Sequence, residues 1–209
     1  MKGIAFIGGE GPDPASCREL AAGADSIVAA DSGLMKVEEA GLSPHWIVGD
    51  MDSLDSRQRL CAYPKERLLL YPVDKDYTDT ELALHLLWEQ GCEQTVLIGG
   101  GGGRIDHLLA LHSLFERSPS PDRWVTERED MYAVKEGQTV PIPAHTGSLV
   151  SVFPLGAGPW HAESRGLKWS LDELCWDKGF FSISNRALAT VSVVSITGRF
   201  LVITERASL

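Results

Sequence analysis

The chain has 209 residues, of which 44% are hydrophobic and 23% charged, an ordinary balance for a globular protein with a buried core. Its 29 acidic and 19 basic residues give a formal net charge of −10, which argues against nucleic acid or an anionic membrane surface as the main partner. Any polyphosphate ligand must therefore be held locally, by metal, Arg, Lys and backbone N–H groups.

The four cysteines are scattered along the chain without a Cys-x-x-Cys spacing. We therefore expect reduced thiols rather than a zinc site or a disulfide framework. The first residues do not have the pattern of a signal peptide, and no apolar run approaches the roughly 18 residues of a membrane span. These features predict a cytoplasmic protein.

The first half of the chain alternates short apolar runs with helical patterns. The apolar runs predict strands that are buried on both faces, as in a parallel sheet, over residues 4–7, 26–30, 46–48, 67–71 and 95–98. Helices are predicted over residues 14–22, 34–40, 56–62, 78–89 and 105–115. This alternation predicts a doubly wound α/β sheet.

The helix predicted from residue 78 has the clearest pattern. Thr78 and Glu81 have the spacing of a capping box. The residues expected on its buried stripe are Leu82, Ala83, Leu86 and Leu87.

A turn-rich joint, Ser118-Pro119-Ser120-Pro121-Asp122, separates this region from a second half rich in strand patterns. Strands are predicted over residues 124–127, 131–134, 138–142, 148–153, 189–196 and 199–204. We predict an α/β domain over residues 1–122 and a β-sandwich domain over residues 123–209. Because so small a sheet buries little apolar surface, we expect it to dock on a partner subunit.

Two acidic clusters lie close together in the first half. Gly49-Asp50-Met51-Asp52-Ser53 directly follows an apolar run, and Asp74, Asp76, Asp79 and Glu81 surround the start of the next helix. Carboxylates at this density repel one another and raise each other's pKa unless a cation lies between them. Hard oxygen ligands from more than one loop suit Mg²⁺, which also binds substrate phosphates. The clusters therefore indicate a metal-dependent enzyme that handles phosphate.

The polar segments 31–33, 49–53, 74–81 and 99–107 each follow a different predicted strand. Ligands of open α/β sheets bind beyond the carboxyl ends of the strands, so we expect these loops to converge. For Asp31 a role as a helix N-cap is equally compatible with the sequence. Asp79 could complement the helix dipole, although several acids are more than capping requires.

Five glycines, residues 99–103, precede Arg104, Asp106 and His107 at a predicted helix start. Backbone without side chains lets N–H groups approach a phosphate, and Arg104 adds a forked donor. The glycines alone could form a flexible turn, but the Arg, Asp and His directly after them make the pattern specific. His107 could act as a base, as a helix-start donor or only structurally. No Gly-Lys-Ser/Thr follows, so this is not a P-loop, and no Gly-x-Ser-x-Gly elbow supports hydrolase chemistry.

In the second half, Trp169 and the segment Ser182-Ile183-Ser184-Asn185 combine an aromatic ring with small polar groups. Such a set can form a pocket in which a flat ligand stacks and the polar groups orient it. A tryptophan in the sandwich core, with Ser and Asn in a turn, explains the same residues at least as well.

Taken in order, these segments resemble the thiamine pyrophosphokinase family, whose members move a diphosphate from ATP to thiamine. The matching segments are residues 30–33, 49–53, 76–81, 102–107, 166–169 and 184–185. The Asp-x-Asp-Ser, Asp-x-Thr-Asp and Gly-Gly-Arg-x-Asp-His patterns are the specific ones. The resemblance implies a Rossmann-like N-terminal domain, a C-terminal β-sandwich and a homodimer, with the site where one subunit's α/β domain meets its partner's sandwich.

The resemblance also implies a role for each matching residue. Metal and catalytic roles fall on Asp50, Asp52 and Asp79, which would hold Mg²⁺, and a catalytic role on Arg104. ATP would be bound by Asp31, Lys75, Asp76, Thr78, Gly102, Gly103, Arg104 and His107. Thiamine would be bound by Asp106, Trp169, Ser182, Ser184 and Asn185.

Two alternatives remain open at this point. The first is diphosphate transfer to another acceptor, such as a hydroxymethylpterin, against which the segments 166–169 and 184–185 argue. The second is a sensor of nucleotide or thiamine diphosphate without turnover. A sensor would not need this many metal-binding carboxylates, so we expect an enzyme.

Overall fold

The computed structural model describes residues 1–51 and 57–206, apart from the side chains of residues 57 and 58. The chain divides into two compact units, Met1–His107 with Val125–Glu127, and Leu108–Trp124 with Arg128–Leu209. Helix α5 (Ile105–Phe115) and strand β6 (Arg123–Val125) contribute residues to both units. The domain boundary after residue 122 stays a prediction.

The first unit contains a parallel sheet in the order β5-β1-β2-β3-β4. Its strands are β1 (Lys2–Phe6), β2 (Ser26–Ala30), β3 (Trp46–Gly49), β4 (Leu68–Leu70) and β5 (Gln94–Ile98). The chain builds outward from β1 to β4 and then returns to the other side of β1 with β5. The strand order therefore reverses between β1 and β5, the place where open α/β sheets bind ligands.

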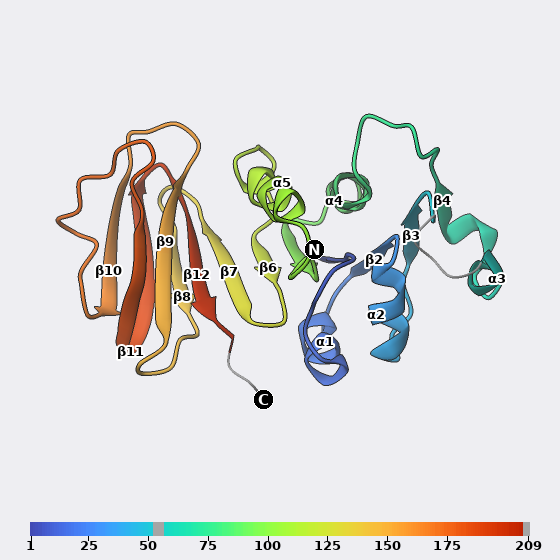
Figure 1. The fold of residues 1–209 in the computed structure, drawn as a ribbon, viewed down its shortest axis with the longest axis horizontal. Coiled ribbons are helices and arrows are strands. Elements are labelled where there is room, and N and C mark those ends of the chain that lie inside the picture. The colour runs from blue at the N-terminus through green and yellow to red at the C-terminus, as the bar shows by residue number, and fades with distance from the viewer. Residues whose placement is uncertain (52–56, 207–209) are drawn as a thin grey trace. The chain divides into compact units, whose positions relative to one another are not determined.

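Helices cover both faces of this sheet. Figure 1 shows α1 (Pro14–Ala21) and α2 (Gly33–Glu39) on one face and α4 (Asp79–Glu89) on the other. Helix α1 begins where the sequence directs it, because the Asp13 carboxylate accepts hydrogen bonds from the N–H groups of Ala15 and Ser16. The α4 capping box is confirmed: Thr78 Oγ1 accepts from the Glu81 N–H, and the Glu81 carboxylate accepts from the Thr78 N–H.

Alternate residues of the central strands point to opposite helical layers, as the pleat requires. On the α1–α2 side, Ile4, Phe6 and Ile27 pack with Leu34 and Val37 in one buried cluster. The predicted α/β architecture is confirmed. The sheet determines where the loops that follow its strands begin.

Three details of the first unit differ from the prediction. Strand β4 is not buried on both faces, because in the described chain it pairs only with β3 at the sheet edge, and 58% of Leu70 is exposed. The buried stripe of α4 is Ala83, Leu84 and Leu87, which places Leu82 and Leu86 at its margin. The helix predicted over residues 56–62 appears as the shorter α3 (Arg57–Leu60), followed by a 3-10 turn, η1 (Lys65–Arg67).

The second unit is an antiparallel β-sandwich. Its strands are β7 (Glu129–Val134), β8 (Thr139–Ile142), β9 (Leu149–Leu155), β10 (His161–Leu167), β11 (Ser182–Thr197) and β12 (Arg199–Glu205). The start of β11 pairs with β9, which continues through β12 to β7, whereas the later part of β11 pairs with β8 and β10. One long strand thus belongs to both layers.

Side chains from both layers form the sandwich core. Val134, Val152, Val191 and Phe200 lie in one buried cluster with Trp176. The predicted β-sandwich is therefore confirmed. The sequence did not indicate β10 or the first half of β11, because these segments are largely polar and only Ala162 of β10 is buried.

The structure also describes the cysteines and the lengths of the helices. Cys17, Cys61, Cys92 and Cys175 are all free thiols. Within residues 1–51 and 57–206, no helix has the length and apolar character needed to cross a membrane.

Candidate functional site

Three loops of the first unit bring four charged side chains together. Asp31 directly follows β2, Asp50 directly follows β3, and Lys75 and Asp79 lie before and at the start of α4. Gly49 makes the approach possible, because a Cβ at this position would lie 3.1 Å from Asp79 Cγ and 3.4 Å from the Asp31 nitrogen. Three of the four loops that were predicted to converge, those after β2, after β3 and before α4, therefore lie close together.

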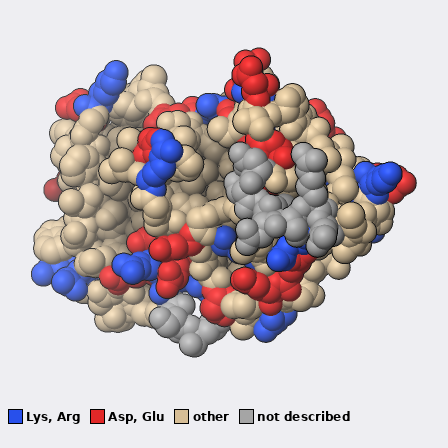
Figure 2. Space-filling view, turned by 45° about the vertical axis from the view of Figure 1, so that its right-hand side comes forward, with Lys and Arg blue, Asp and Glu red and all other residues tan. Residues whose placement is uncertain are grey.

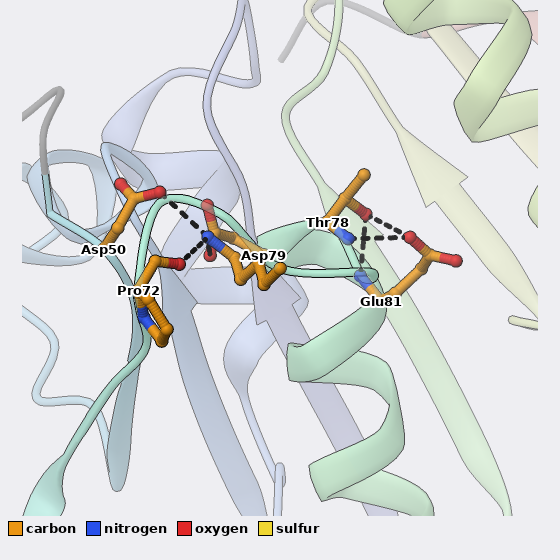
Figure 3. A network of polar contacts seen from close by, with 6 residues as sticks. Asp50, Pro72, Thr78, Asp79 and Glu81 are labelled. Atoms are coloured by element: carbon orange, nitrogen blue, oxygen red, sulfur yellow. Dashed lines mark hydrogen bonds and ion pairs between the residues drawn. The ribbon is translucent and has the colours of Figure 1, made fainter.

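The Lys75 ammonium lies between two of the carboxylates. Its Nζ is 2.8 Å from Asp50 Oδ2 and 3.3 Å from Asp79 Oδ1, and it donates a third contact to the Pro72 carbonyl at 3.3 Å (Figure 3). Only 13% of the Lys75 side chain and 10% of the Asp50 side chain are exposed. A cation thus lies between the carboxylates, as their mutual repulsion requires, and it belongs to the protein itself.

Two carboxylate oxygens in this cluster are buried without a hydrogen bond: Asp31 Oδ1, and Asp79 Oδ1, whose 3.3 Å contact with Lys75 is an ion pair without hydrogen-bond geometry. Asp31 also has a backbone φ of +46°, a conformation that non-glycine residues rarely adopt. Neither residue is needed as a cap: α2 has Ser32 at its N-cap without a side-chain bond, and α4 is capped by Thr78. Buried acceptors without donors and backbone strain are features that cluster at functional sites.

The electrostatics follow from this burial. Desolvation raises the pKa of Asp79, and the charges of Asp50 and Asp31 add to that rise while Lys75 opposes it. For Lys75, burial alone would lower the pKa, but the carboxylates of Asp50 and Asp79 outweigh it and keep the pKa above the ordinary lysine value. The ammonium therefore stays charged at neutral pH.

The donors present suit Mg²⁺, since Asp31, Asp50 and Asp79 offer hard carboxylate oxygens from separate loops, two of them unsatisfied. Asp52, the third predicted metal ligand, lies outside the described residues. In the part of the chain that the structure describes, no three His, Cys, Asp or Glu side chains form a ready metal-binding group. Lys75 is the cation that lies against Asp50 and Asp79 and offsets their charge.

The glycine run forms a defined loop beside the end of β1. The N–H groups of Gly100 and Gly101 donate to the carbonyls of Gly8 and Glu10, and that of Gly99 donates to Val125. These three N–H groups are therefore engaged within the protein. A phosphate-binding role stays a prediction for Gly102 and Gly103, which both have a positive φ.

Arg104 and Asp106 form a pair on the surface of the first unit. Arg104 Nε donates to Asp106 Oδ1 at 3.1 Å, and Nη2 lies 2.5 Å from Oδ2. The bidentate contact lowers the pKa of Asp106 and raises that of Arg104. The His107 N–H also donates to Asp106, and all three side chains are exposed. Arg104, predicted to contact phosphate, is thus held by the residue predicted to contact thiamine.

Glu10 is a charged residue of this region that the sequence analysis missed. Glu10 follows Gly8-Gly9 after the end of β1 and forms a β-bridge with Gly101. A Cβ on Gly102 would lie only 2.5 Å from the carboxylate carbon of Glu10, so the two residues are in close contact. Ligands of open α/β sheets bind beyond the carboxyl ends of the strands, and the loop after β1 lies at such an end. Applied to this loop, the same rule would have indicated Glu10.

The residues predicted to bind thiamine lie in the second unit. Asn185 is buried and forms two hydrogen bonds with the Trp169 backbone, accepting from its N–H at 3.1 Å and donating to its carbonyl at 2.6 Å. The Trp169 ring is 54% exposed, with the Lys168 ammonium 4.5 Å from its centroid. Asn185 therefore positions the segment that carries Trp169, and the ring itself is free to stack on a ligand.

Other exposed groups surround this segment on the start of β11. Ser182 pairs with β9, and Ser184 has a φ of +57° and donates its N–H to the Ser151 hydroxyl. Phe181 stacks on Phe153, with ring centroids 5.6 Å apart. The alternative of a tryptophan in the sandwich core applies to Trp176, not to Trp169.

Charged side chains are interspersed over the surface seen in Figure 2, which has no continuous basic area. This distribution agrees with the net charge of −10. Phosphate groups would therefore depend on local partners rather than on a general positive field.

Family models match both halves of the chain. The model described as thiamin pyrophosphokinase, catalytic domain, matches residues 17–122, and that described as thiamin pyrophosphokinase, vitamin B1 binding domain, matches residues 138–199. A thiamine pyrophosphokinase of Bacillus subtilis is 32% identical over 83 residues, which are 39% of each chain. Thiamin pyrophosphokinase 1 of Caenorhabditis elegans is 27% identical over 162 residues, 72% of this chain and 65% of that one. The matches thus span less than two thirds of these relatives' lengths.

Solved structures match over the whole chain. A thiamin pyrophosphokinase family protein from Enterococcus faecalis superposes with a TM-score of 0.77 at 26% identity, covering 100% of both chains. The thiamin pyrophosphokinase of Geobacillus thermodenitrificans gives 0.75 at 26% identity, covering 100% of this chain and 99% of that one. The Bacillus subtilis enzyme gives 0.79 at 20% identity, with 99% and 100% covered, which supports the fold alone.

Proposed function

Because the chain belongs to the thiamin pyrophosphokinase family, we propose that it transfers the diphosphate of ATP to the hydroxyl of thiamine, giving thiamine diphosphate and AMP. The observation that carries this proposal is the pairing of two features. A catalytic-domain match and a vitamin B1 binding-domain match follow each other along one chain, and the first contains the cluster of Asp31, Asp50 and Asp79.

We further propose that the reaction depends on Mg²⁺. Asp50 and Asp79 would hold the ion together with Asp52, and the unsatisfied Asp31 oxygen is a further donor in the same place. When bound, Mg²⁺ would neutralise the polyphosphate charge that develops during transfer. The oxygen-only donor set is the support for this choice.

The protein's own contribution would be positioning and charge complementarity. The thiamine hydroxyl oxygen attacks the β-phosphorus in line, forming the new P–O bond as the bond to the bridging oxygen of AMP breaks. A carboxylate of the cluster accepts the hydroxyl proton. Lys75, Asp76, Thr78 and Arg104 would orient the phosphates, with Arg104 leaving Asp106 to meet them.

The thiamine end of the reaction would use the second unit. Trp169 would stack on the aromatic rings of thiamine, while Ser182, Ser184 and Asn185 shape the surrounding segment, and Asp106 would meet the aminopyrimidine. We propose a homodimer in which these residues face the partner's acidic cluster. Exposed apolar side chains support an interface, among them Ile105 at 74% and Ile183 at 56% exposure. Four free thiols fit a reducing compartment, and we propose the cytoplasm.

The substitution Asp50→Asn tests the assignment of the catalytic cluster. The variant should fold, since it replaces a carboxylate with an amide of the same shape, and should lose turnover by at least about a hundredfold, because transfer depends on charge neutralisation at this point. AMP release that requires both thiamine and Mg²⁺ provides the assay.

Asp122→Asn is the matched control, because it also removes a Lys–Asp pair, with Lys135 at 2.6 Å in the second unit. It should keep wild-type turnover. Near-normal AMP release by Asp50→Asn would exclude this residue from the catalytic machinery.

A further inference from the structure

Lys75 occupies an unusual position for a residue expected to bind ATP. Its ammonium is directed at the protein's own carboxylates, 2.8 Å from Asp50 and 3.3 Å from Asp79 (Figure 3). Lys75 and Asp79 are four residues apart at the start of α4, so the local path of the chain brings the two side chains together. The side chain is also largely buried, unlike the exposed lysines that form weak surface pairs.

The surrounding charges explain why a cation is needed here. Asp79 is partly desolvated, and Asp31 and Asp50 both act on it electrostatically. Without a positive charge, these carboxylates would repel one another in a poorly solvated place. The ammonium supplies that charge, but it leaves Asp31 Oδ1 and Asp79 Oδ1 without a hydrogen bond, so it satisfies the oxygens incompletely.

From this geometry we propose that Lys75 is a built-in counterion that competes with the divalent metal for Asp50 and Asp79. An ammonium in direct contact with both carboxylates cannot share them with a metal ion that binds the same oxygens. Metal entry therefore requires the ammonium to leave, and it becomes available to the phosphate oxygens of ATP. The inference rests on the metal assignment in the proposed function, and it concerns how the metal-free protein holds its ligands.

The proposal predicts that removal of the Lys75 charge strengthens metal binding. In Lys75→Met the carboxylates lose their internal cation, so Mn²⁺ added alone, as a probe for Mg²⁺, should bind on the order of tenfold more tightly than in the wild type. Lys75→Arg keeps a positive charge in the same place and should stay close to the wild type. Electron paramagnetic resonance of free Mn²⁺ measures these affinities without any turnover.

Lys135→Met is the matched control, because it removes a lysine paired with Asp122 in the second unit and should leave Mn²⁺ affinity unchanged. Circular dichroism establishes that each variant folds, and Lys75→Gln supplies a second neutral side chain should the Met variant fail to fold. A rise in the melting temperature with Mn²⁺ that is larger for the neutral variants than for the wild type would support the same conclusion.

The possible results separate the two hypotheses. Saturable Mn²⁺ binding that is equal or weaker in Lys75→Met and Lys75→Gln overturns the counterion role and leaves the metal assignment intact. Absence of saturable binding in both the wild type and the neutral variants overturns the counterion role and also contradicts the assignment of Mg²⁺ to these carboxylates. Equal tightening in Lys75→Met, Lys75→Gln and Lys135→Met would reflect net charge alone and would also overturn it.

Discussion

At the scale of single residues, Gly49 determines how closely the acidic loops approach. Its φ of +134° is one that side chains disfavour, and a Cβ would lie 3.1 Å from both Cγ and Oδ1 of Asp79. A side chain here would therefore push Asp79 away from the end of β3. The absence of a side chain at Gly49 therefore lets Asp79 lie close to the end of β3, in addition to allowing the turn.

We expect Gly49→Ala to cost about 1–3 kcal/mol of stability, through strain and crowding, and to lower turnover at least about tenfold by displacing Asp79. Gly91→Ala is the control, since Gly91 also has a positive φ but has no atom within 4 Å of the added Cβ. It should lose stability and keep turnover. Urea unfolding and AMP release measure the two effects, and equal turnover in both variants would contradict the role given to Gly49.

Asp79 should also couple stability to pH. Its pKa is raised above the ordinary 3.8, so the folded state holds the proton more tightly than the unfolded chain does. The stabilisation is complete below pH 3.8 and is lost as the pH rises through the raised folded value. We therefore expect Asp79→Asn to be more stable than the wild type at pH 7, with an advantage that shrinks toward pH 4.

Urea unfolding between about pH 2 and pH 7.5, on the order of half-unit steps, would follow this difference. Asp106→Asn is an informative comparison, because the pKa of Asp106 is lowered and the sign reverses: the wild type should lose a little stability as the pH falls through that lowered value. An Asp79→Asn variant that is less stable than the wild type at neutral pH would contradict the account.

The sequence predicted which acids converge but not how they are neutralised. Asp31 and Asp50 directly follow the buried strands β2 and β3, so sheet geometry brings them together, and Asp79 joins them from the start of α4. The position of Lys75 between Asp50 and Asp79 depends on the path of the loop before α4, which no periodicity encodes. In the same way, nothing local indicates that the N–H groups of Gly100 and Gly101 bond to the loop after β1.

At the scale of elements, the start of α4 carries both structure and site. The capping box between Thr78 and Glu81 determines where the helix begins. Asp79, which directly follows Thr78, is therefore held at the acidic cluster. The elements of the first unit were well predicted, because buried strands and capped helices have strong local signals. Strand β10 was not, since its exposed polar face leaves little apolar pattern to detect.

We expect Thr78→Ala to lose about 1 kcal/mol, within the range of 0.5–2 measured for N-caps, because the Glu81 N–H loses its acceptor. Thr78→Ser keeps the hydroxyl and should remain within a few tenths of a kcal/mol of the wild type. Chemical denaturation of the three proteins provides the comparison. Equal losses in the Ala and Ser variants would show that packing of the Thr78 methyl group, not capping, matters.

At the scale of the whole molecule, the chain joins an α/β unit that carries carboxylates to a β-sandwich that carries an exposed aromatic segment. The first suits a metal and a polyphosphate, and the second suits a flat organic ring, with Trp169 available for stacking. This division of labour is the physical basis for proposing a transfer between two unlike substrates.

The most direct test is to identify both products after incubating the protein with thiamine, ATP and Mg²⁺. Chromatography with mass detection should show thiamine diphosphate and AMP formed in equal amounts, with neither product when Mg²⁺ is chelated. Formation of ADP with thiamine monophosphate, or AMP release without any thiamine product, would contradict diphosphate transfer by this chain.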